Sequence, residues 1–538
     1  MPRRHASPFL RSFYLSLLLL VAPSAWAATY NVGPGQPLAT IGAVPWATLQ
    51  PGDTVRIHWR STPYKEKWVI CRQGTAAAPI TVTGVPGPLG QLPVIDGAGA
   101  VTAPGLNYWS ETRGVIKIGG ANTPPDLMPR YIVIENLEVR GANQANSFSD
   151  DNGSNQTYDQ NASTIYLEKG ENITIRNSVL HDSGNGLFVA SSDSTVSRDI
   201  LIQGNYIYGN GNNGSIYEHN SYTAAIGITF EYNRYGPLRA GAGGNNLKDR
   251  SAGTVVRYNW IEGGNRQLDL VDGEDSSLIV NDSRYGATHV YGNVLIEPAG
   301  AGNRQVVHYG GDSGTTSAYR KGTLYFFNNT IVSTRTDRNT IFRLSTNDER
   351  ADVRNNIFYT TLPGSDLSLV DESGVLDVSH NWAKPGWNVS FSTFQGTVNN
   401  DGTMVEGSSP GFVSEIGQDL HLTAQSAAVN AGTSLNAAVL PAHNLTRQYI
   451  KHMSSETRPS AAPLDIGAFE FGSGGTPVSC DLSGDGSVNV VDVQLSINQV
   501  LGIVACGGAD ISQDGSCNVI DVQRFINAAL GLGCQVGT

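Results

Sequence analysis

Apolar and polar residues alternate in a short unit that recurs through the middle of the chain. Each unit is a run of alternating apolar side chains followed by a turn that contains Asn, as in 200–205 and 228–233. The Asn residues that close the clear and weaker copies stand 25 to 36 residues apart: Asn205, Asn233, Asn259, Asn293, Asn329, Asn356 and Asn381. Alternation predicts short β-strands, and the period predicts a solenoid whose coils bury their apolar faces by stacking on one another.

The residue types in the repeat indicate which kind of solenoid the chain forms. Its strands are rich in β-branched and aromatic residues and are broken by Gly and Asn, which predicts an all-β, right-handed parallel β-helix. A β-propeller needs about four strands per repeat, and too few residues separate the turns; a leucine-rich solenoid needs a leucine frame that is absent. The Asn fits a bend because it tolerates a left-handed backbone and its amide can bond to the equivalent Asn one coil away.

The N-terminus has the pattern of a signal peptide. Arg3, Arg4 and Arg11 precede or flank an apolar run, and Ala25 and Ala27 form a small-x-small cleavage site. This pattern predicts a secreted protein that loses residues 1–27. No other stretch is long and apolar enough to predict a membrane span.

Composition and charge narrow the classes of function. The chain has 62 Gly, 21 Tyr and only 15% charged residues, which is typical of a β-rich extracellular protein. Its formal net charge is −12, yet six basic side chains gather between residues 234 and 266. A basic island on an acidic protein predicts a local site for an anion and argues against a nucleic-acid partner.

Cysteines mark a separate C-terminal module. Cys480, Cys506, Cys517 and Cys534 predict two disulfides whose pairing the sequence leaves open, and Cys71 is expected to be a buried strand residue. A Gly-rich stretch before them predicts a linker. The expected division is a signal peptide (1–27), a β-helix domain (28–470), a linker (471–479) and the module (480–538).

Two twelve-residue loops, beginning at Asp481 and Asp510, carry the chemistry of the module. Oxygen-bearing side chains at loop positions 1, 3, 5, 9 and 12, Gly at position 6 and a backbone carbonyl at position 7 are what calcium requires. The expected ligands of the first ion are Asp481, Ser483, Asp485, Ser487, Asn489 and Asp492. Those of the second ion are Asp510, Ser512, Asp514, Ser516, Asn518 and Asp521.

The paired loops, each followed by an apolar-patterned helix, closely resemble a type I dockerin. Asp at position 12, where an ordinary EF-hand has Glu, belongs to that resemblance. It implies a cohesin-type partner that attaches the chain to a scaffold or cell surface. The alternative is a calcium-stabilised appendage without a partner, and cysteines near both loops depart from the usual dockerin pattern.

Polar residues that stand about one coil apart predict a site on one face of the solenoid. His219 lies 29 residues before Lys248, and the segment near Leu270 follows 22 residues after it. The candidate catalytic residues are Lys248, Arg250, His219, Tyr258 and His308. The candidate substrate-binding residues are Arg266, Asn246, Asp269, Asp272 and Tyr309.

The coil around Lys248 resembles the β-helical polysaccharide lyases, particularly the alginate lyase and chondroitinase B group. In that group a Lys abstracts the proton α to a uronate carboxylate, and Lys248 matches it. The Arg of the next coil has no match, since Asp269 or Val271 stands there, so its role falls to Arg250 or Arg266. The resemblance implies an anionic polysaccharide substrate and β-elimination, with the pKa of Lys248 lowered by Arg250.

The sequence does not single out the proton donor, and it leaves a third calcium ion open. Tyr258, Tyr309 or His308 could return a proton to the leaving oxygen. An active-site calcium would require the carboxylates at positions 269, 272, 274 and 275.

Two alternatives remain at this point. Asp269 and Asp272, with His308, are similar to the acid pair and His of β-helical pectin hydrolases, although that family's motifs are missing. The other alternative is a β-helix that binds glycan at a surface without catalysis.

Overall fold

The computed structural model describes residue 1 and residues 27–459, 463–472, 480–483, 487–504, 506, 508–512, 514 and 516–537. Residues 2–26 of the predicted signal peptide and residues 473–479 of the predicted linker lie outside this part of the chain, so those two predictions stay untested.

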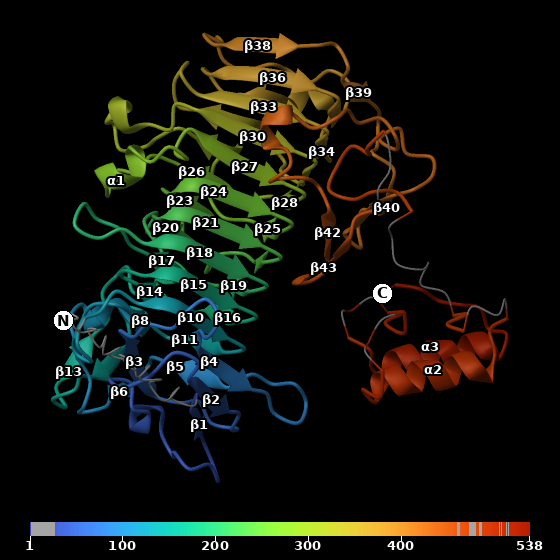
Figure 1. Cartoon of the computed structure of the whole chain (residues 1–538). Coiled ribbons are helices and arrows are strands. Elements are labelled where there is room, and N and C mark those ends of the chain that lie inside the picture. Colours follow the sequence, from blue (N-terminus) through green and yellow to red (C-terminus); the bar gives the residue numbers. More distant parts are fainter. Residues whose placement is uncertain are drawn as a thin grey trace.

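Three long sheets form the body of the protein, and the chain visits them in turn (Figure 1). The first sheet contains β1 (Thr29–Val32), β2 (Thr54–His58), β4 (Ile80–Val85), β10 (Arg130–Glu135), β15 (Glu171–Arg176), β18 (Arg198–Gln203), β21 (Ile226–Glu231), β24 (Ala252–Arg257), β27 (Ala287–Tyr291), β30 (Thr323–Phe327), β33 (Arg350–Arg354), β36 (Val375–Ser379) and β38 (Thr397–Asn400). The second contains β5 (Val94–Asp96), β11 (Glu138–Arg140), β16 (Val179–His181), β19 (Tyr206–Tyr208), β22 (Arg234–Tyr235), β25 (Trp260–Glu262), β28 (Val294–Glu297), β31 (Thr330–Ser333), β34 (Ile357–Thr360), β37 (Trp382–Ala383) and β39 (Val405–Glu406). The third contains β13 (Asn155–Thr157), β12 (Ser147–Ser149), β6 (Ala100–Thr102), β3 (Glu66–Ile70), β8 (Gly114–Ile118), β14 (Ser163–Leu167), β17 (Asn185–Val189), β20 (Ser221–Thr223), β23 (Leu247–Asp249), β26 (Leu268–Leu270), β29 (Gln305–Tyr309), β32 (Asn339–Leu344) and β35 (Leu367–Val370).

Apart from the antiparallel pair β12 and β13 at the edge of the third sheet, the strands pair in parallel with the equivalent strands of neighbouring coils. In the first sheet, Val255 of β24 pairs with His289 of β27, and His289 pairs with Tyr325 of β30. Parallel sheets stacked one coil per repeat make a parallel β-helix, which is the fold that the repeat predicted. Inward-facing apolar side chains from all three sheets fill its core.

The repeating Asn residues form a continuous ladder inside the turn between the first and second sheets. The amide of each donates to the side-chain oxygen of the next at 2.9 to 3.1 Å, from Asn205 through Asn233, Asn259, Asn293, Asn329 and Asn356 to Asn381. The predicted bond between coils is therefore confirmed.

The left-handed residue of this turn is not the ladder Asn. It is the residue before it, such as Tyr232, Tyr258 or Asn328, with φ of 57°, 54° and 51°. The expectation that Asn itself takes the left-handed backbone holds in two coils that precede these, at Asn136 and Asn177, with φ of 58° and 50°.

Residues 407–459 and 463–471 leave the solenoid and fold back over its second sheet (Figure 1). This extension contains two antiparallel pairs, β40 (Phe412–Ser414) with β41 (Asp419–Leu422) and β42 (Arg447–Ile450) with β43 (Ser454–Thr457). Outward-facing apolar side chains of the second sheet and those of the extension form one buried cluster: Trp260, Val294, Ile296, Val332, Ile357, Tyr359, Trp382, Leu420, Leu422, Ala428, Tyr449, Ile466, Ala468 and Phe469. The outer face of the second sheet is therefore covered from β25 to β37.

Smaller elements decorate the third sheet. The antiparallel pair β7 (Asn107–Tyr108) and β9 (Ala121–Thr123) lies near its beginning. The short helix α1 (Ser277–Val280) buries Ile279 against Ala224, Ile226 and Ala252.

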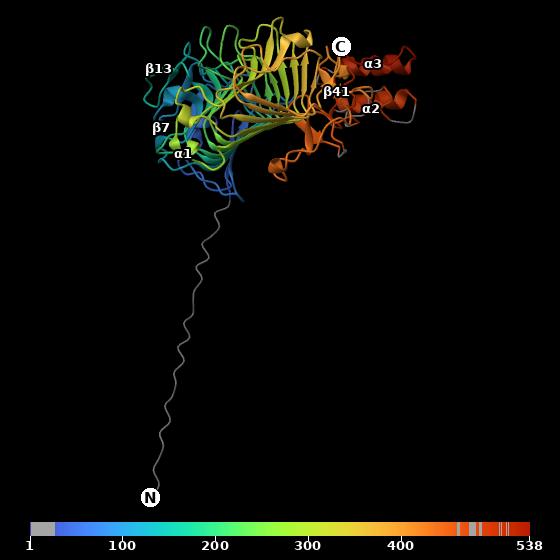
Figure 2. The same ribbon diagram turned by 90° about the horizontal axis from the view of Figure 1, so that it is seen from above.

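The C-terminal module contains two helices, α2 (Val490–Val500) and α3 (Val519–Ala529), which lie side by side (Figure 1, Figure 2). Each begins at an Asn N-cap with a capping box, Asn489 with Asp492 and Asn518 with Asp521. Disulfides join Cys480 to Cys534 and Cys506 to Cys517, while Cys71 is free and buried. Two disulfides fit an extracellular protein. Among the described residues, no helix has the length and apolar character that a membrane span requires.

Candidate active site

One outward-facing row of side chains crosses the coils of the third sheet. Register partners on successive parallel strands point the same way, about 4.8 Å apart. The register gives this row: Tyr166, Phe188, Tyr222, Lys248, Asp269, His308 and Arg343. It begins with aromatic side chains and continues with ionisable ones.

A cleft of about 1120 Å³ follows this row. Four of its lining residues have a buried polar atom with no hydrogen-bond partner among the described residues: Arg113 Nε, Glu218 Oε2, Asn245 Oδ1 and Arg266 Nε. Leaving a buried polar atom unpaired costs free energy. Its size and its many ionisable lining residues make this cleft the candidate active site.

Lys248 lies in the middle of this cleft and is 7% exposed. Its Nζ donates to Asp269 Oδ2 at 3.0 Å and also to Oδ2 of Asp312. Burial by itself would lower the pKa of Lys248, but the two carboxylates outweigh it and raise the pKa. The predicted lowering by Arg250 is therefore wrong, because its guanidinium is outweighed by the same carboxylates. Lys248 is an ammonium group in the free protein.

Asp269 connects Lys248 to His308. Burial would raise the pKa of Asp269, but Lys248 and the hydrogen bond with His308 hold it well below its ordinary value. The ionised carboxylate can only accept, so Nδ1 of His308 donates to Oδ1 of Asp269 at 2.8 Å. Burial lowers the pKa of His308 itself, which keeps the ring neutral near neutral pH.

Ser345, His308 and Asp269 are linked by hydrogen bonds in the order of a catalytic triad, yet the surroundings of Ser345 favour a positioning role. Its Oγ lies 2.9 Å from Nε2 of His308. The same hydroxyl accepts the backbone N–H of Gly311 at 2.9 Å and lies 2.9 Å from the Gly311 carbonyl oxygen. These contacts surround the hydroxyl, and Ser345 is not among the residues that line the cleft. Ser345 therefore orients His308 and is not placed to attack a substrate.

Arg250 forms the wall beside Lys248. It is 4% exposed, and its Nη2 contacts Asp312 Oδ1 at 2.8 Å and Glu274 Oε1 at 2.6 Å. Its Nε donates to the Tyr222 hydroxyl at 2.9 Å. With these donors occupied, Arg250 positions Asp312 and Tyr222.

Two other guanidinium groups are better placed to meet an anion. Arg266 lines the cleft with its Nη1 3.8 Å from Asp269 Oδ1, and its Nε is unpaired within the described part of the chain. Arg343 is exposed at the far end of the row. Both can offer hydrogen bonds to a carboxylate of a bound ligand.

His219 also lines the cleft, where it is 3% exposed. Its Nδ1 accepts the backbone N–H of Asn245 at 2.8 Å, and its ring meets Tyr222 edge-on at 5.5 Å. The structure thus brings together His219, Lys248, Arg250, Arg266, Asp269 and His308, six of the ten predicted site residues.

The other four predicted site residues lie elsewhere, which corrects the expectation that all ten line one face. Tyr258 packs between Tyr232 and Tyr291 at a turn, where its hydroxyl accepts the Thr446 N–H. The remaining three are fully buried.

Each of those three is buried for a different reason. Asn246 uses its amide to donate to the carbonyls of Gly236, Glu262 and Gly263 inside a turn. Asp272 is 0% exposed and accepts the backbone N–H of Asp312 at 2.9 Å. Tyr309 follows His308 directly, so strand alternation turns it into the core.

The proposed acidic metal cluster is not assembled in the cleft. Asp269 pairs with Lys248, while Asp272 and Glu274 contact Arg250. Within the described residues, no group of three or more His, Cys, Asp or Glu side chains is arranged to hold a metal ion.

Sequence reasoning missed several residues of the cleft. Asp312 reaches Lys248 from 64 residues along the chain, and only its place after a strand and Gly310–Gly311 hinted at exposure. Tyr222 and Phe188 could have been found by extending the one-coil spacing backward from Lys248, because they are its register partners.

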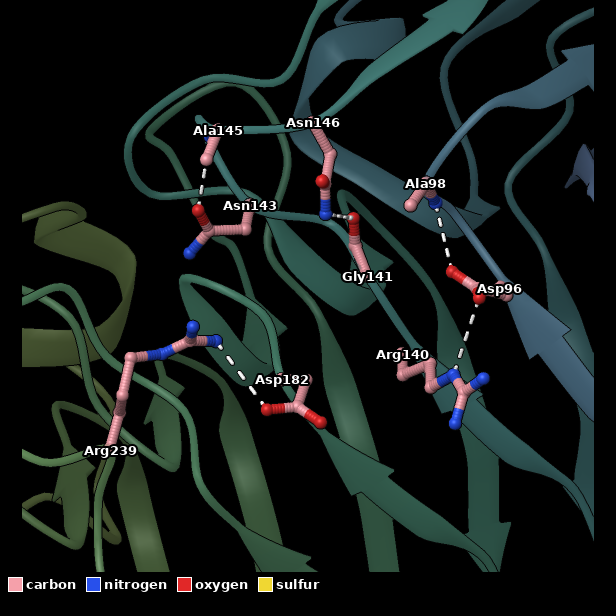
Figure 3. Close-up of a pocket in the computed structure, with 9 residues that line it drawn as sticks. All are labelled: Asp96, Ala98, Arg140, Gly141, Asn143, Ala145, Asn146, Asp182 and Arg239. Carbon is pink, nitrogen blue, oxygen red and sulfur yellow. Dashed lines mark hydrogen bonds and ion pairs between the residues drawn. The ribbon is translucent and has the colours of Figure 1, made fainter.

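A second, smaller pocket of about 260 Å³ lies at the turn after the second sheet (Figure 3). Its charges are balanced within the pocket. Arg140 Nε donates to Asp96 Oδ2 at 3.3 Å, and Arg239 Nη2 lies 3.7 Å from Asp182 Oδ1. It lacks the aromatic side chains and the excess of cations that mark the larger cleft.

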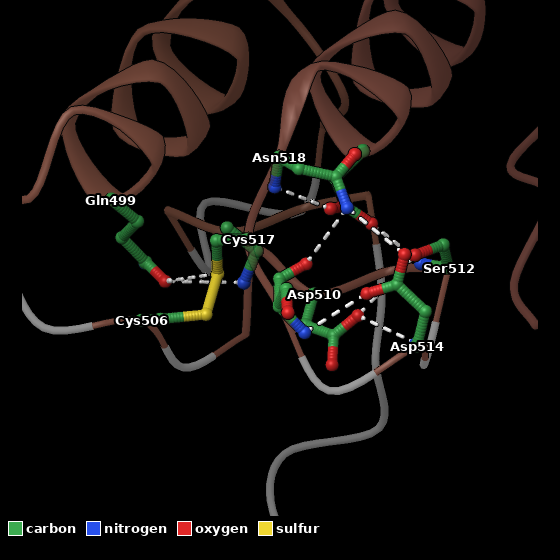
Figure 4. Close-up of a disulfide and its surroundings, with 10 residues drawn as sticks. Gln499, Cys506, Asp510, Ser512, Asp514, Cys517 and Asn518 are labelled. Carbon is green, nitrogen blue, oxygen red and sulfur yellow. Dashed lines mark hydrogen bonds between the residues drawn. A yellow bond between two sulfur atoms is a disulfide. The ribbon is translucent and has the colours of Figure 1, made fainter. Parts of the chain in front are cut away.

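In the second calcium-type loop, all predicted side-chain ligands are described. Asp510, Ser512, Asp514 and Asn518 turn toward one another (Figure 4), and the Asp514 N–H donates to Asp510 Oδ1 at 3.1 Å. Asp521 accepts the N–H groups of Ser512 and Asn518 at 2.7 and 2.8 Å, which closes the loop.

The first loop closes in the same way. Asp492 accepts the N–H groups of Ser483 and Asn489 at 2.7 and 2.8 Å. Asp485, its predicted ligand at position 5, lies outside the described residues. The oxygen-only donor set of both loops fits calcium, and the two ions remain a prediction.

Comparisons with known proteins assign no family. No protein-family model and no curated protein matches the chain. Among solved structures, the chain is similar to the pectate lyase Pel9A, with 14% identity, a TM-score of 0.43, and coverage of 82% of this chain and 96% of that one.

Two further solved structures have lower sequence identity and lower TM-scores. A GH136 lacto-N-biosidase from Eubacterium ramulus has 12% identity and a TM-score of 0.42 over 70% of this chain and 68% of that one. An alginate lyase from Paenibacillus sp. has 13% identity and a TM-score of 0.26 over 67% and 90%. Likeness at this distance assigns no activity, so the function is argued from the cleft.

Proposed function

We propose that the protein is an extracellular enzyme that cleaves a uronate-containing polysaccharide by β-elimination, with Lys248 as the base. The observation that carries the proposal is a buried amine in the middle of a long polar cleft that also holds Arg266 and Arg343. An elimination needs a base at the proton α to the carboxylate and a cation at the carboxylate itself.

The row of register partners gives the path of the polymer. Tyr166, Phe188 and Tyr222 offer aromatic surfaces before Lys248, and the Arg113 guanidinium lies 4.8 Å from the ring centres of both Tyr166 and Phe188. Aromatic faces suit the apolar faces of sugar rings, and cations suit their carboxylates. A chain of uronates would therefore cross the coils, along the axis of the solenoid.

The reaction moves one proton and breaks one bond. The Lys248 amine takes the proton from C5 of the uronate, a double bond forms between C4 and C5, and the C4–O bond breaks. The leaving oxygen then takes a proton from the Lys248 ammonium, which restores the free amine. Arg266, with an unpaired Nε, neutralises the carboxylate whose charge grows during proton removal.

The ion pairs of Lys248 impose a pH dependence. Only the free amine can act as a base, and Asp269 and Asp312 raise the pKa of Lys248 although burial opposes them. The rate should therefore increase with pH through that raised pKa, and it is expected to be highest at alkaline pH.

A panel of uronate polymers tests the proposal. The wild-type protein should release products with unsaturated ends, which absorb ultraviolet light. Replacing Lys248 by Ala should lower the rate by about 10²- to 10⁴-fold. Lys321, an exposed lysine paired with Asp348, is the matched control: Lys321→Ala should leave the rate unchanged.

Hydrolysis by two carboxylates is the second candidate, because Lys248 Nζ contacts both Asp269 and Asp312. The pair predicted from sequence, Asp269 with Asp272, is replaced here, since Asp272 does not line the cleft. Hydrolysis gives new reducing ends without ultraviolet absorbance. Binding of the polymer without either product would leave a glycan-binding protein.

For the C-terminal module we propose calcium binding and a cohesin-type partner. Equivalent positions in the two halves expose apolar side chains: Val490 and Val519 are 76% and 75% exposed, and Leu501 and Leu530 are 68% and 72% exposed. Exposed apolar patches on a small module favour a protein partner.

Calorimetry on the full chain separates the two proposals for the module. Two calcium-binding events are expected, and Asp510→Ala should remove one of them. Surface binding to immobilised cohesins then tests the partner, with Val490→Asp and Val519→Asp weakening it while calcium binding persists.

A further inference from the structure

The imidazole of His219 is fixed in one tautomer by the backbone of the next coil. The Asn245 N–H donates to Nδ1 of His219 at 2.8 Å. A ring nitrogen that accepts a hydrogen bond carries its lone pair, so the single proton of the neutral ring must be on Nε2. His219 therefore offers an N–H donor and no free acceptor.

The surroundings also keep this ring uncharged. The side chain is 3% exposed, and burial together with the Lys248 ammonium lowers the pKa of His219 to about 3. Arg250 acts in the same direction, while Asp269 opposes it. Hence the ring neither takes up nor releases a proton at ordinary pH, and it can be neither a general base nor a general acid.

The contact that fixes the tautomer requires a glycine. A Cβ added to Gly244 would fall 1.7 Å from the Glu218 carbonyl oxygen and 3.1 Å from Nδ1 of His219. Only a residue without a side chain lets the 244–245 backbone approach the ring this closely. The tautomer is thus built into the packing of two neighbouring coils.

The Nε2–H group is left for a ligand. Within the described residues, Nε2 has no hydrogen-bond partner, and His219 lines the cleft beside Lys248. We infer that His219 is an uncharged hydrogen-bond donor that holds a carboxylate oxygen of the uronate while negative charge develops on it. The inference rests on the proposed elimination and gives His219 a role within it.

An uncharged donor suits this role for a physical reason. The carboxylate carries one charge before proton removal and a second, shared charge in the intermediate. A hydrogen bond from a neutral donor strengthens as that charge grows, so it lowers the barrier more than it stabilises the bound substrate. Arg266 supplies the cation that the ground state needs, since Lys248 must be the neutral amine when it acts as the base.

Nitrogen NMR of the labelled full-length protein without substrate tests the tautomer. The ring of His219, assigned by comparison with His219→Gln, should show a protonated Nε2, an unprotonated Nδ1 and no titration from mildly acidic to alkaline pH. A protonated Nδ1, or a titration near the ordinary histidine value, would overturn the inference.

Kinetics test the catalytic role separately. His219→Ala should lower kcat by about 10²- to 10³-fold with little change in KM, as for loss of one oxyanion donor. His219→Gln, which can keep a side-chain N–H in the cleft, should retain more activity than His219→Ala. The alkaline pH dependence should persist in both variants, because it belongs to Lys248.

Two controls keep the outcomes distinct. His421→Gln changes a half-buried histidine of the extension and should leave kcat unchanged. Equal thermal unfolding of the variants would exclude a folding defect; if His219→Ala is less stable, the comparison rests on His219→Gln. An increase in KM of about 10²- to 10³-fold with an unchanged kcat would contradict the donor role. A protein with the expected tautomer but without unsaturated products would disprove the elimination and leave the tautomer standing.

Discussion

The second and third sheets share one backbone geometry, yet their outer faces differ: part of the second sheet's face is covered by the extension, and the third sheet's face lines a cleft. Trp260, Ile296 and Trp382 face outward from the second sheet and are covered by the extension. Tyr222, Lys248 and His308 face outward from the third sheet and line an open cleft. The coils therefore supply a rigid frame, and the residues at outward positions decide whether a face becomes packing surface or chemistry.

The largest expected effect comes from breaking the covered face. Trp382 is 0% exposed within the cluster that joins the second sheet to the extension. Trp382→Ala should reduce the free energy of unfolding by about 3 to 5 kcal/mol. Chemical denaturation measures the change. Since the cleft lies on another sheet, activity per folded molecule should stay at the wild-type value, and a selective loss of activity would contradict the separation of the two faces.

The next effect comes from changing one charge on the open face. Asp269→Asn removes a carboxylate that raises the pKa of Lys248 and orients His308. The maximal rate should decrease by about 10²-fold, as for loss of an orienting partner. The pH–rate profile should move toward lower pH, because the remaining Asp312 stabilises the ammonium less. A profile that stays in place would show that Lys248 is not the titrating base.

The contact between the extension and the first sheet should also respond to acid. His289 of the first sheet stacks on His443 of the extension with ring centres 3.6 Å apart, and burial followed by the charge of His443 lowers the pKa of His289 to about 3 from 6.5. Below pH 6.5 the His289 imidazole binds a proton in the unfolded chain but not in the folded chain. The free energy of unfolding therefore decreases as pH decreases from 6.5 toward 3.

The variant His289→Phe tests this origin. Each such histidine contributes a slope of up to about 1.4 kcal/mol per pH unit in that window. Phe keeps the stacked ring but cannot titrate, so the unfolding free energy of His289→Phe should depend less on pH than that of the wild type. An unchanged dependence would assign the acid sensitivity to other groups, such as His219 or His452.

The smallest expected effect concerns the aromatic end of the cleft. Phe188 lies two strands before Lys248 and is only partly buried. Phe188→Ala should raise KM for a long polymer about fivefold, corresponding to about 1 kcal/mol of lost ring contact. Kinetics with a short oligomer that does not reach this position provide the control, since its KM should not change.

The sequence predicted the parallel coils because their determinants are local. Alternating apolar residues and a turn Asn recur in every repeat, and the Asn ladder follows from that period alone. The fate of residues 407–459 and 463–471 could not be predicted in the same way. Their apolar residues lack the period, and their partners, such as Trp260 and Trp382, lie far away along the chain.

The candidate site was predicted in part for the same reason. Lys248 and Asp269 are register partners, so coil spacing brought them together. The prediction for Tyr309 is wrong because Tyr309 directly follows His308 on one strand, so the two side chains point to opposite faces of the sheet. The pKa of Lys248 was misjudged because Asp312 reaches it from a loop whose path no local pattern specifies.

Chemical rescue tests most directly whether the Lys248 amine is the base. The rate of unsaturated-product formation is measured for Lys248→Ala with and without added methylamine. The variant should be nearly inactive, and methylamine should restore part of the rate at alkaline pH while leaving Lys321→Ala unaffected. If Lys248→Ala forms unsaturated products at the wild-type rate without any added amine, the account is contradicted.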